Sequence, residues 1–336
     1  MRLMSLLIGA IVLIGLISGC GNNDNDTNAN GNTSGGKGNS SDVVATYDGG
    51  EITLGQYERY KSIMKVLFGD MYTQLSMMDP NFDETILSQQ IGIEILAERA
   101  TDDQLKEAKT QAEEDWKKYR KEQEEAGVAD GLDRALETEG LKESDLIDFV
   151  EKEMASMFYY RDQVDDEEAQ AHHEQLLEEN EHAFDQATVR HILIQTYDLQ
   201  NDEEVLPEEE GLARAEEVRQ KLIDGESFDE LAEEYSDDEG SVSTGGLMED
   251  VNVNMWVENF KKAAIELPID EISEPIKTEY GYHVMKVESR RTVDFDELKQ
   301  DIKMSIAQEE YQRFLTEELP ELVDEKSFKL PKAATE

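Results

Sequence analysis

Apolar residues recur at helical spacing along most of the chain, on both sides of a central segment that has a different pattern. The first ordered segment is predicted to be a short strand at residues 43–47, which Asp48-Gly49-Gly50 turns back. Amphipathic helices follow, each with Leu, Ile, Met, Phe or Tyr on one face and Glu or Lys on the other. Their predicted ranges are 53–68, 84–100, 102–125, 130–138, 143–180 and 295–325. Residues 102–125 contain few large aliphatic side chains, so we expect that helix to be mostly solvated.

The central segment alternates between strands and helices. A strand rich in β-branched residues is predicted at 188–195, and an amphipathic helix follows at 212–223. Ser227-Phe228-Asp229-Glu230 is typical of a capping box, and it opens a second helix. A third helix is predicted at about 256–266 and a last strand at 281–287. This pattern predicts an α+β unit between two helical segments.

The amino end has the anatomy of an export signal. Met1-Arg2 precedes an unbroken apolar run at 3–17, which is shorter than the ~20 residues that span a bilayer. Ile17-Ser18-Gly19-Cys20 resembles a bacterial lipobox, in which the cysteine is acylated and becomes the new amino terminus. We therefore expect cleavage after Gly19 and lipid attachment at Cys20, against the alternative of an incidental cysteine. Cys20 is the only cysteine, so no disulfide is expected in the mature chain.

A polar stretch rich in Gly, Asn, Ser and Asp follows the cysteine up to about Asp42. It has almost no apolar side chain and cannot bury enough surface to fold. Some 20 residues of such a linker have a root-mean-square reach of roughly 25 Å. The sequence therefore predicts a protein tethered to the outer face of the bacterial cytoplasmic membrane.

The charge balance excludes one large class of partner. The chain has 32 Lys and Arg against 79 Asp and Glu, a net charge of −47. Nucleic-acid binding is excluded, because it requires clusters of basic residues that neutralise phosphates. The 38% hydrophobic fraction still predicts folded cores. Salt screens the mutual repulsion of so many carboxylates, which suits a protein in salty surroundings or outside the cell.

Motifs of the central segment occur together in a recognisable order. They read VRHILIQ at 189–195, FDELAEEYSDD at 228–238, Gly245-Gly246, NFKKAAIEL at 259–267 and ISEPIKTEYGYHVMKV at 272–287. In this order and spacing they resemble the parvulin family of peptidyl-prolyl isomerases over residues 188–290. With the lipobox and the helical flanks, the whole chain is similar to extracytoplasmic foldase lipoproteins.

The resemblance implies an α+β fold with a parvulin-like antiparallel sheet and surrounding helices, inserted in an all-α chaperone domain. The expected divisions are a signal peptide at 1–19, a tether at 20–41, an N-terminal helical chaperone part at 42–185, a parvulin-like isomerase domain at 186–290, and a C-terminal helical segment at 291–336 that completes the chaperone domain.

The resemblance also implies the site. It places His191 and His283 side by side beneath the pocket, with Asp238 where parvulins often have Cys or Asp. Rotation about an X-Pro amide breaks no bond, and its barrier of ~18–20 kcal/mol comes from resonance. A site that excludes water and favours the twisted amide can therefore act without covalent chemistry. A single strand histidine is usually structural, and even this pair can shape the pocket rather than exchange protons.

The implied proline socket consists of Leu247, Met255 or Trp256, and Phe260, although each can also be an ordinary core residue. Parvulins usually carry Met four residues before the pocket Phe. Here Met255 lies five residues before Phe260 and Trp256 lies four before it, so either Trp256 replaces the Met or the loop has an extra residue. Met248-Glu249-Asp250 also replaces the usual Gly-aromatic pair. The departure leaves open a weak or inactive isomerase that acts as a binding module of a holdase chaperone.

The expected function is a membrane-anchored peptidyl-prolyl isomerase and chaperone for secreted proteins, with unfolded chains containing X-Pro bonds as partners. The acidic stretch 197–211 would repel a phosphate, which favours unmodified segments in neutral or basic clients. Dimerisation of the helical part is left open. No cofactor or metal is expected, since His172-His173 lacks the second histidine of a zinc helix. A solute-binding lipoprotein would leave the parvulin motifs unexplained.

Overall fold

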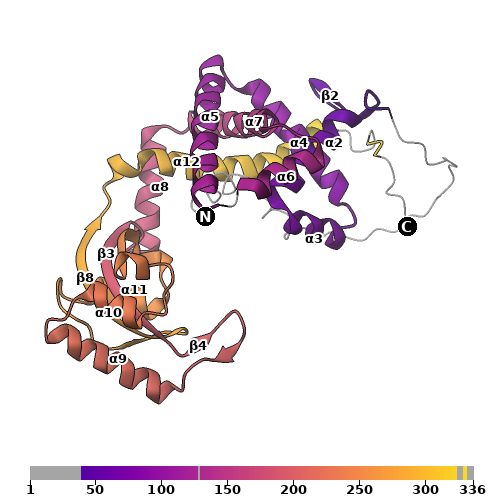
Figure 1. Cartoon of the computed structure of the whole chain (residues 1–336). Coiled ribbons are helices and arrows are strands. Elements are labelled where there is room, and N and C mark those ends of the chain that lie inside the picture. The colour runs from indigo at the N-terminus through magenta and orange to yellow at the C-terminus, as the bar shows by residue number, and fades with distance from the viewer. Residues whose placement is uncertain (1–38, 128, 324–327, 331–336) are drawn as a thin grey trace, which may run out of the picture. The chain divides into compact units, whose positions relative to one another are not determined.

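The computed structural model describes residues 39–127, 129–323 and 328–330 (Figure 1). The predicted signal peptide, Cys20 and most of the tether lie outside these residues. The described chain forms two compact units, one from residues up to Asp165 and from Asp301 onward, the other from Asp166–Gln300. The first unit is almost entirely helical and the second holds an antiparallel sheet with helices, which confirms the expected fold class. Among the described residues, no helix is both long and apolar enough to cross a bilayer.

The helical unit begins with a hairpin of β1 (Val43–Tyr47) and β2 (Gly50–Thr53). The helices that follow are α2 (Leu54–Phe68), α3 (Asp70–Met78), α4 (Phe82–Arg99), α5 (Asp102–Glu125), α6 (Ala129–Glu139) and α7 (Glu143–Arg161). The C-terminal part adds most of α12 (Phe295–Arg313), a π-helical turn (Phe314–Glu318) and α13 (Leu319–Leu322). Helix α3 was not predicted, and the other expected helices before residue 140 occur within two residues of their expected ends.

Local capping explains where two of these helices begin. The side chain of Thr53 accepts a hydrogen bond from Gln56 N, and the Gln56 side chain reaches back to Thr53 N in a capping box. Thr101 and Gln104 form the same arrangement at the start of α5. Each box satisfies two backbone donors that the first turn leaves without partners.

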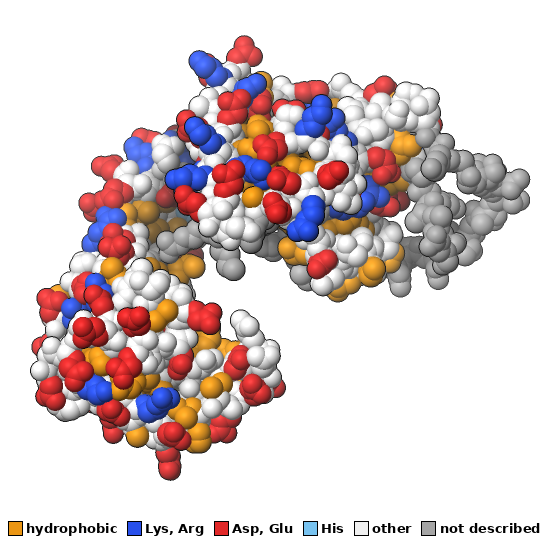
Figure 2. All heavy atoms as spheres, viewed as in Figure 1, with side chains coloured by type: hydrophobic (Ala, Val, Ile, Leu, Met, Phe, Trp, Pro, Cys, Tyr) orange, Lys and Arg blue, Asp and Glu red, His pale blue; other side chains and the backbone are white. Residues whose placement is uncertain are grey.

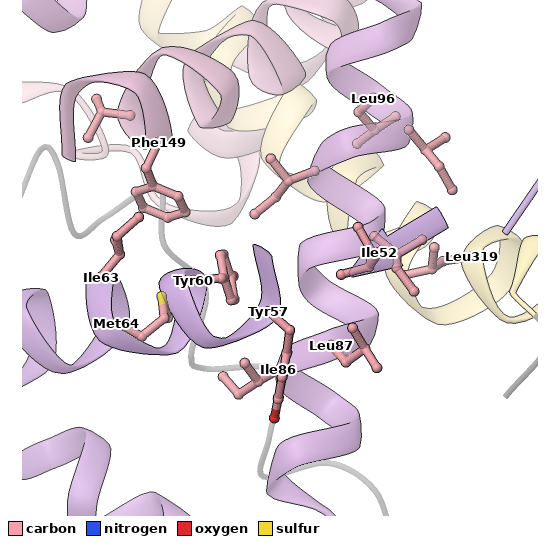
Figure 3. Packing of buried hydrophobic residues seen from close by; sticks show 14 of the residues in the cluster. Ile52, Tyr57, Tyr60, Ile63, Met64, Ile86, Leu87, Leu96, Phe149 and Leu319 are labelled. Carbon is pink, nitrogen blue, oxygen red and sulfur yellow. The ribbon is translucent and has the colours of Figure 1, made fainter. Parts of the chain in front are cut away.

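One apolar core joins the two ends of the chain in this unit. Side chains from α2, α4 and α7 meet those of the C-terminal segment, among them Tyr57, Ile86 and Leu319, as Figure 3 shows. The main-chain N–H of Asp48 also donates to Leu322 O at 3.1 Å, which ties the first hairpin to α13. The C-terminal segment therefore completes the core of the N-terminal helices.

Helix α5 is mostly exposed, as the sequence predicts, but one of its faces is buried. Gln104, Ala108, Ala112 and Trp116 form a buried stripe with a four-residue spacing. Ala108 packs with Ala155 and Phe158 of α7. Small alanine side chains allow the two helices to approach closely, so this face is buried without large aliphatic residues.

The helix expected at 143–180 is two helices. Helix α7 ends at Arg161 with Asp162 as its C-cap, and α8 (Asp166–Glu179) begins four residues after that cap. The first turn of α8 carries three carboxylates, which favour a helix N-terminus at this place. The break coincides with the limit between the two units, so α8 belongs to the sheet unit.

The sheet unit contains a four-stranded antiparallel sheet in the order β6-β3-β8-β7. Its strands are β3 (Asp185–Gln195), β6 (Leu247–Asn252), β7 (Ile276–Lys277) and β8 (Gly281–Thr292). Its further helices are α9 (Glu208–Ile223), α10 (Phe228–Tyr235) and α11 (Glu258–Glu266). A small hairpin, β4 (Tyr197–Asp198) with β5 (Glu203–Glu204), lies outside the sheet.

Side chains alternate between the two faces of β3 and β8. Ile192, Ile194 and Val284 pack with α9 and α10 on one face. Val189, Met285 and Val287 pack with α11 on the other face. The helix cap expected at Ser227 is present without its side-chain hydrogen bond, and the carboxylate of Asp229 accepts from Arg190 instead.

Candidate active site

The two central strands place His191 and His283 on the same face of the sheet. His191 pairs with Met285 and Leu193 pairs with His283 in the β3–β8 register, so the two imidazoles are near neighbours on the α11 side. Their Nδ1 atoms lie 3.3 Å apart. Both side chains are buried, with exposed fractions of 4% and 5%. The structure therefore brings together the two histidines that the sequence singled out.

Asp238 and Ser241 complete one end of this pair. His191 Nε2 lies 2.9 Å from Asp238 Oδ2 and 3.2 Å from Ser241 Oγ. The Ser241 hydroxyl donates to the same carboxylate oxygen, and Gly240 N donates to Asp238 Oδ1 at 3.2 Å. The hydrogen bond from His191, together with that from Ser241, holds the pKa of Asp238 well below its usual range despite partial burial.

Thr278 completes the other end, because its Oγ1 lies 2.8 Å from His283 Nε2. Burial, followed by the nearby His191, lowers the pKa of His283 to about 3, so this imidazole is neutral near pH 7.

These contacts order the protons along the row. An ionised Asp238 only accepts, so His191 donates from Nε2. When His191 is neutral, its Nδ1 must accept from His283 Nδ1–H, and His283 Nε2 then accepts the Thr278 hydroxyl proton. The direction Thr278 to His283 to His191 to Asp238 satisfies every ring nitrogen.

Aromatic and apolar side chains lie against the histidine pair. The Phe260 ring meets His191 edge to face, with centroids 5.2 Å apart, and meets His283 in the same way at 5.1 Å. Trp256 packs on Phe260 at 5.1 Å. Met248 and Trp256 both contact the buried cluster that contains Phe260. These three residues form the apolar wall next to the pair.

Two of the expected socket residues lie elsewhere. Met255 has an exposed fraction of 78%, whereas Trp256 contacts Phe260, so Trp256 rather than Met255 is part of the apolar wall. Leu247 pairs with Arg190 across β6 and β3, which puts it on the face opposite to His191. Met248 pairs with Val189 and lies on the Phe260 side instead.

The local geometry of β6 explains this choice. The β3–β6 register shifts between Ala187 and Val189, opposite Glu249 and Asp250, and Asp250 has a φ of 48°. An irregularity of this kind changes which side chains of a strand face the core.

A glycine turn holds the strand of His191 against the loop of Ser241. Gly246 O accepts from His191 N at 2.9 Å, and the φ of Gly246 is 75°. A Cβ atom at this position would lie 2.1 Å from His191 O, so the turn requires glycine.

Arg190, next to His191 in β3, binds the same loop from the other face of the sheet. Its guanidinium donates to Glu288 Oε1 at 2.9 Å and to Asp229 Oδ1 at 2.7 Å. It also donates to the carbonyl oxygens of Thr244 and Gly245 at 3.3 and 3.2 Å.

Four residues of the site were not predicted as site residues from the sequence, namely Ser241, Thr278, Met248 and Arg190. Each lies within or beside a motif that was noted, but hydroxyl and guanidinium groups have no periodic pattern that signals their partners. Within the described residues, no group of His, Cys, Asp and Glu side chains is arranged to hold a metal ion.

Comparisons with known proteins identify the family that the sheet unit matches. Residues 164–291 match the family model of the PPIC-type PPIASE domain. The chain is 28% identical over 296 residues to foldase protein PrsA of Caldanaerobacter subterraneus subsp. tengcongensis, covering 84% of this chain and 85% of that protein. It is 42% identical over 101 residues to foldase protein PrsA 1 of Bacillus cereus, covering 30% and 35% of the two chains.

A further relative is the chaperone SurA of Chromohalobacter salexigens, with 38% identity over 133 residues, 39% of this chain and 28% of that protein. The chain thus spans about a third or less of the second and third of these relatives. Among solved structures, PrsA from Bacillus anthracis covers 73% of this chain and 99% of its own, with 20% identity and a TM-score of 0.33. Residues 164–291 thus form a PPIC-type peptidyl-prolyl isomerase domain, in a chain that is similar over most of its length to a PrsA foldase.

Proposed function

We propose that this protein is a lipid-anchored isomerase and chaperone that acts on X-Pro bonds of secreted proteins after their export. The observation that carries the isomerase site is the buried row from Thr278 through the two histidines to Asp238, directly against Phe260. It lies in a domain whose family catalyses peptidyl-prolyl isomerisation. Binding of unfolded protein chains follows from the relationship to foldases and chaperones.

The site fits a rotation that needs no covalent step. The apolar wall of Met248, Trp256 and Phe260 takes the proline ring and removes water from its amide. Water removal strengthens the local electrostatic field, and an amide that loses its planarity gains from fixed dipoles around its carbonyl oxygen.

The histidines act from beneath this wall. Because both are buried and their protons are ordered, we assign them the role of fixing the position of Phe260 and the field around the rotating bond. Proton exchange with the substrate is not required by this mechanism.

The negative charge of the sheet unit favours binding of unmodified or basic client segments. The hairpin β4–β5 and the start of α9 carry Asp198, Asp202, Glu203, Glu204 and Glu208–Glu210. Figure 2 shows Asp and Glu side chains at many places on the sheet unit, with some Lys and Arg between them. A phosphorylated segment would be repelled from this region.

The test is NMR exchange spectroscopy of cis/trans interconversion in an unphosphorylated X-Pro peptide, with the full chain from residue 21 onward as catalyst. We expect enhancement by the parent protein, little enhancement of the phosphorylated peptide, and loss in His283→Ala. No enhancement from a folded protein would contradict the isomerase role.

A second candidate is a holdase whose parvulin domain only binds clients. The placement of Leu247 and Met255 outside the apolar wall supports it, because the socket differs from the expected one. Suppression of client aggregation without any isomerisation would identify this alternative.

The lipobox at Ile17–Cys20 supports an anchor at the outer face of the cytoplasmic membrane. Mass spectrometry of the mature amino-terminal peptide from a bacterial host should find a lipid on Cys20. The Cys20→Ala variant should carry no lipid and should no longer be found in the membrane fraction. A parent protein without a lipid would contradict the anchor.

A further inference from the structure

The helical unit has a groove of about 380 Å³ between α2, α4 and α7, which no part of the isomerase reaction uses. Tyr60, Ile63 and Phe149 contribute apolar surface to it. The rings of Tyr60 and Phe149 meet edge to face at 5.7 Å, and Figure 3 shows Tyr60 and Ile63 of α2 on the side of Phe149 of α7. The groove thus has an aromatic and aliphatic floor. Its volume lies near the lower end of the ~300–1,000 Å³ typical of ligand pockets, which suits one or two side chains.

Charged side chains surround this floor with an excess of carboxylates. Arg59 pairs with Asp145, and Lys152 Nζ lies 2.7 Å from both carboxylate oxygens of Glu94. Asp148 and Glu151 also line the groove and add two carboxylates to these pairs. The groove is therefore electrostatically complementary to a cationic segment.

The floor also contains a polar group without a partner. Gln90 lines the groove with an exposed fraction of 5%, and its Oε1 has no hydrogen-bond partner within the described residues. Buried carbonyl oxygens are almost always satisfied in native proteins. Because the terminal torsion of Gln is soft, its amide can turn toward a donor that enters the groove. A peptide N–H next to an inserted side chain is such a donor.

We propose that this groove binds an extended segment of an unfolded client, with one large apolar side chain on the floor and a neighbouring Lys or Arg beside Asp148 and Glu151. The client's backbone N–H donates to Gln90. The identity of the occupant rests on the proposed chaperone function. A second copy of this chain is disfavoured as the occupant, because each copy carries a net charge of −47.

The probe is a fluorescein-labelled peptide of nine residues with a central Leu-Phe flanked by Lys, without proline so that it does not enter the isomerase socket. Its anisotropy is titrated with the chain from residue 21 onward. The double variant Asp148→Lys with Glu151→Lys should weaken binding about tenfold. The control, Glu113→Lys with Glu114→Lys on the exposed face of α5, makes the same change of net charge away from the groove and should leave binding within about twofold.

A second variant tests the floor. Gln90→Met keeps the volume but removes the unpartnered oxygen, so the protein should unfold at a higher urea concentration while its affinity for the peptide falls several-fold. A purely structural role of Gln90 would not lower the affinity of a stabilised protein.

Two results would overturn the groove and indicate diffuse attraction. One is an equal loss of peptide affinity in the two charge-reversal pairs, and the other is an unchanged affinity in Asp148→Lys with Glu151→Lys. Isomerisation and suppression of client aggregation, both measured on the parent protein, separate this failure from that of the proposed function. All groove variants should retain the parent rate, because none of their residues lies in the sheet unit.

Discussion

The Nδ1 atoms of His191 and His283 face one another at 3.3 Å, so one of them donates and the other accepts. Asp238 requires His191 to donate from its other nitrogen, and this fixes the tautomer of both rings when both are neutral. The row is thus a single unit in which a change at either end is felt at Phe260. This coupling underlies the expected behaviour of the site variants.

Replacing either histidine with alanine should lower isomerisation by about tenfold or more, because roughly 1.4 kcal/mol of transition-state stabilisation corresponds to a factor of ten. Exchange spectroscopy on an X-Pro peptide measures the rate, and light scattering of an aggregating client measures holdase activity, which we expect to survive. His172→Ala in α8 is the matched control. Retention of the parent rate in both site variants would refute the assignment.

Trp256 and Met255 should behave differently although they are adjacent. Trp256→Ala removes the ring that packs on Phe260 and should weaken binding of an X-Pro peptide by about tenfold. Met255→Ala removes an exposed side chain and should change stability and binding by less than about 0.5 kcal/mol. Titration of an unlabelled peptide by NMR gives both affinities. A larger effect at Met255 would show that the usual methionine position is retained in solution.

Gly246→Ala should cost more than the roughly 1–3 kcal/mol of left-handed backbone strain, because the new Cβ would collide with His191 O. Gly225→Ala is the matched control in the same unit. Its φ is 95°, but no atom lies within 4 Å of the added Cβ, so only the strain remains. Urea unfolding followed by far-UV circular dichroism measures both. Similar costs at the two positions would mean that the loop of Gly246 moves freely away from β3.

Glu153 in α7 should make the helical unit less stable as pH rises. Burial raises the pKa of this carboxyl to about 8, from about 4.5 in an unfolded chain. Between these values the unfolded state has lost the proton that the folded state keeps, so stability falls with increasing pH by at most about 1.4 kcal/mol per unit. Glu153→Gln should flatten this slope and raise the urea midpoint at pH 8. An unchanged difference between variant and parent from pH 5 to pH 8 would contradict the buried neutral acid.

The sheet unit should show the opposite dependence. The pKa of His283 is lowered from 6.5 to about 3, so the unfolded state binds a proton below pH 6.5 that the folded state does not bind. Stability therefore falls as pH falls from about 6.5 toward 3. The lowered pKa of Asp238 adds to this loss only below its ordinary value of 3.8. Hydrogen exchange of β3 and β8 amides at pH 4.5 and 7 measures the effect, and His283→Phe should reduce it. Equal protection at both pH values in the parent would contradict the lowered pKa.

Local signals along the chain were enough to predict the class of fold, most of the helices, the two central strands and the residues of the histidine pair. These signals are the 3.6-residue and two-residue periods of apolar positions and the motifs in order along the chain. Such signals are contained within one segment, so they can be read without knowing its neighbours.

Which side chains meet depends instead on how distant segments pack together. The irregular register of β6 puts Met248 rather than Leu247 beside Phe260, and the path into α11 puts Trp256 there and leaves Met255 exposed. The buried alanine stripe of α5 depends on Phe158 of α7, more than forty residues away. Strand register and helix contacts are set by the summed packing of distant segments, and no local period encodes them.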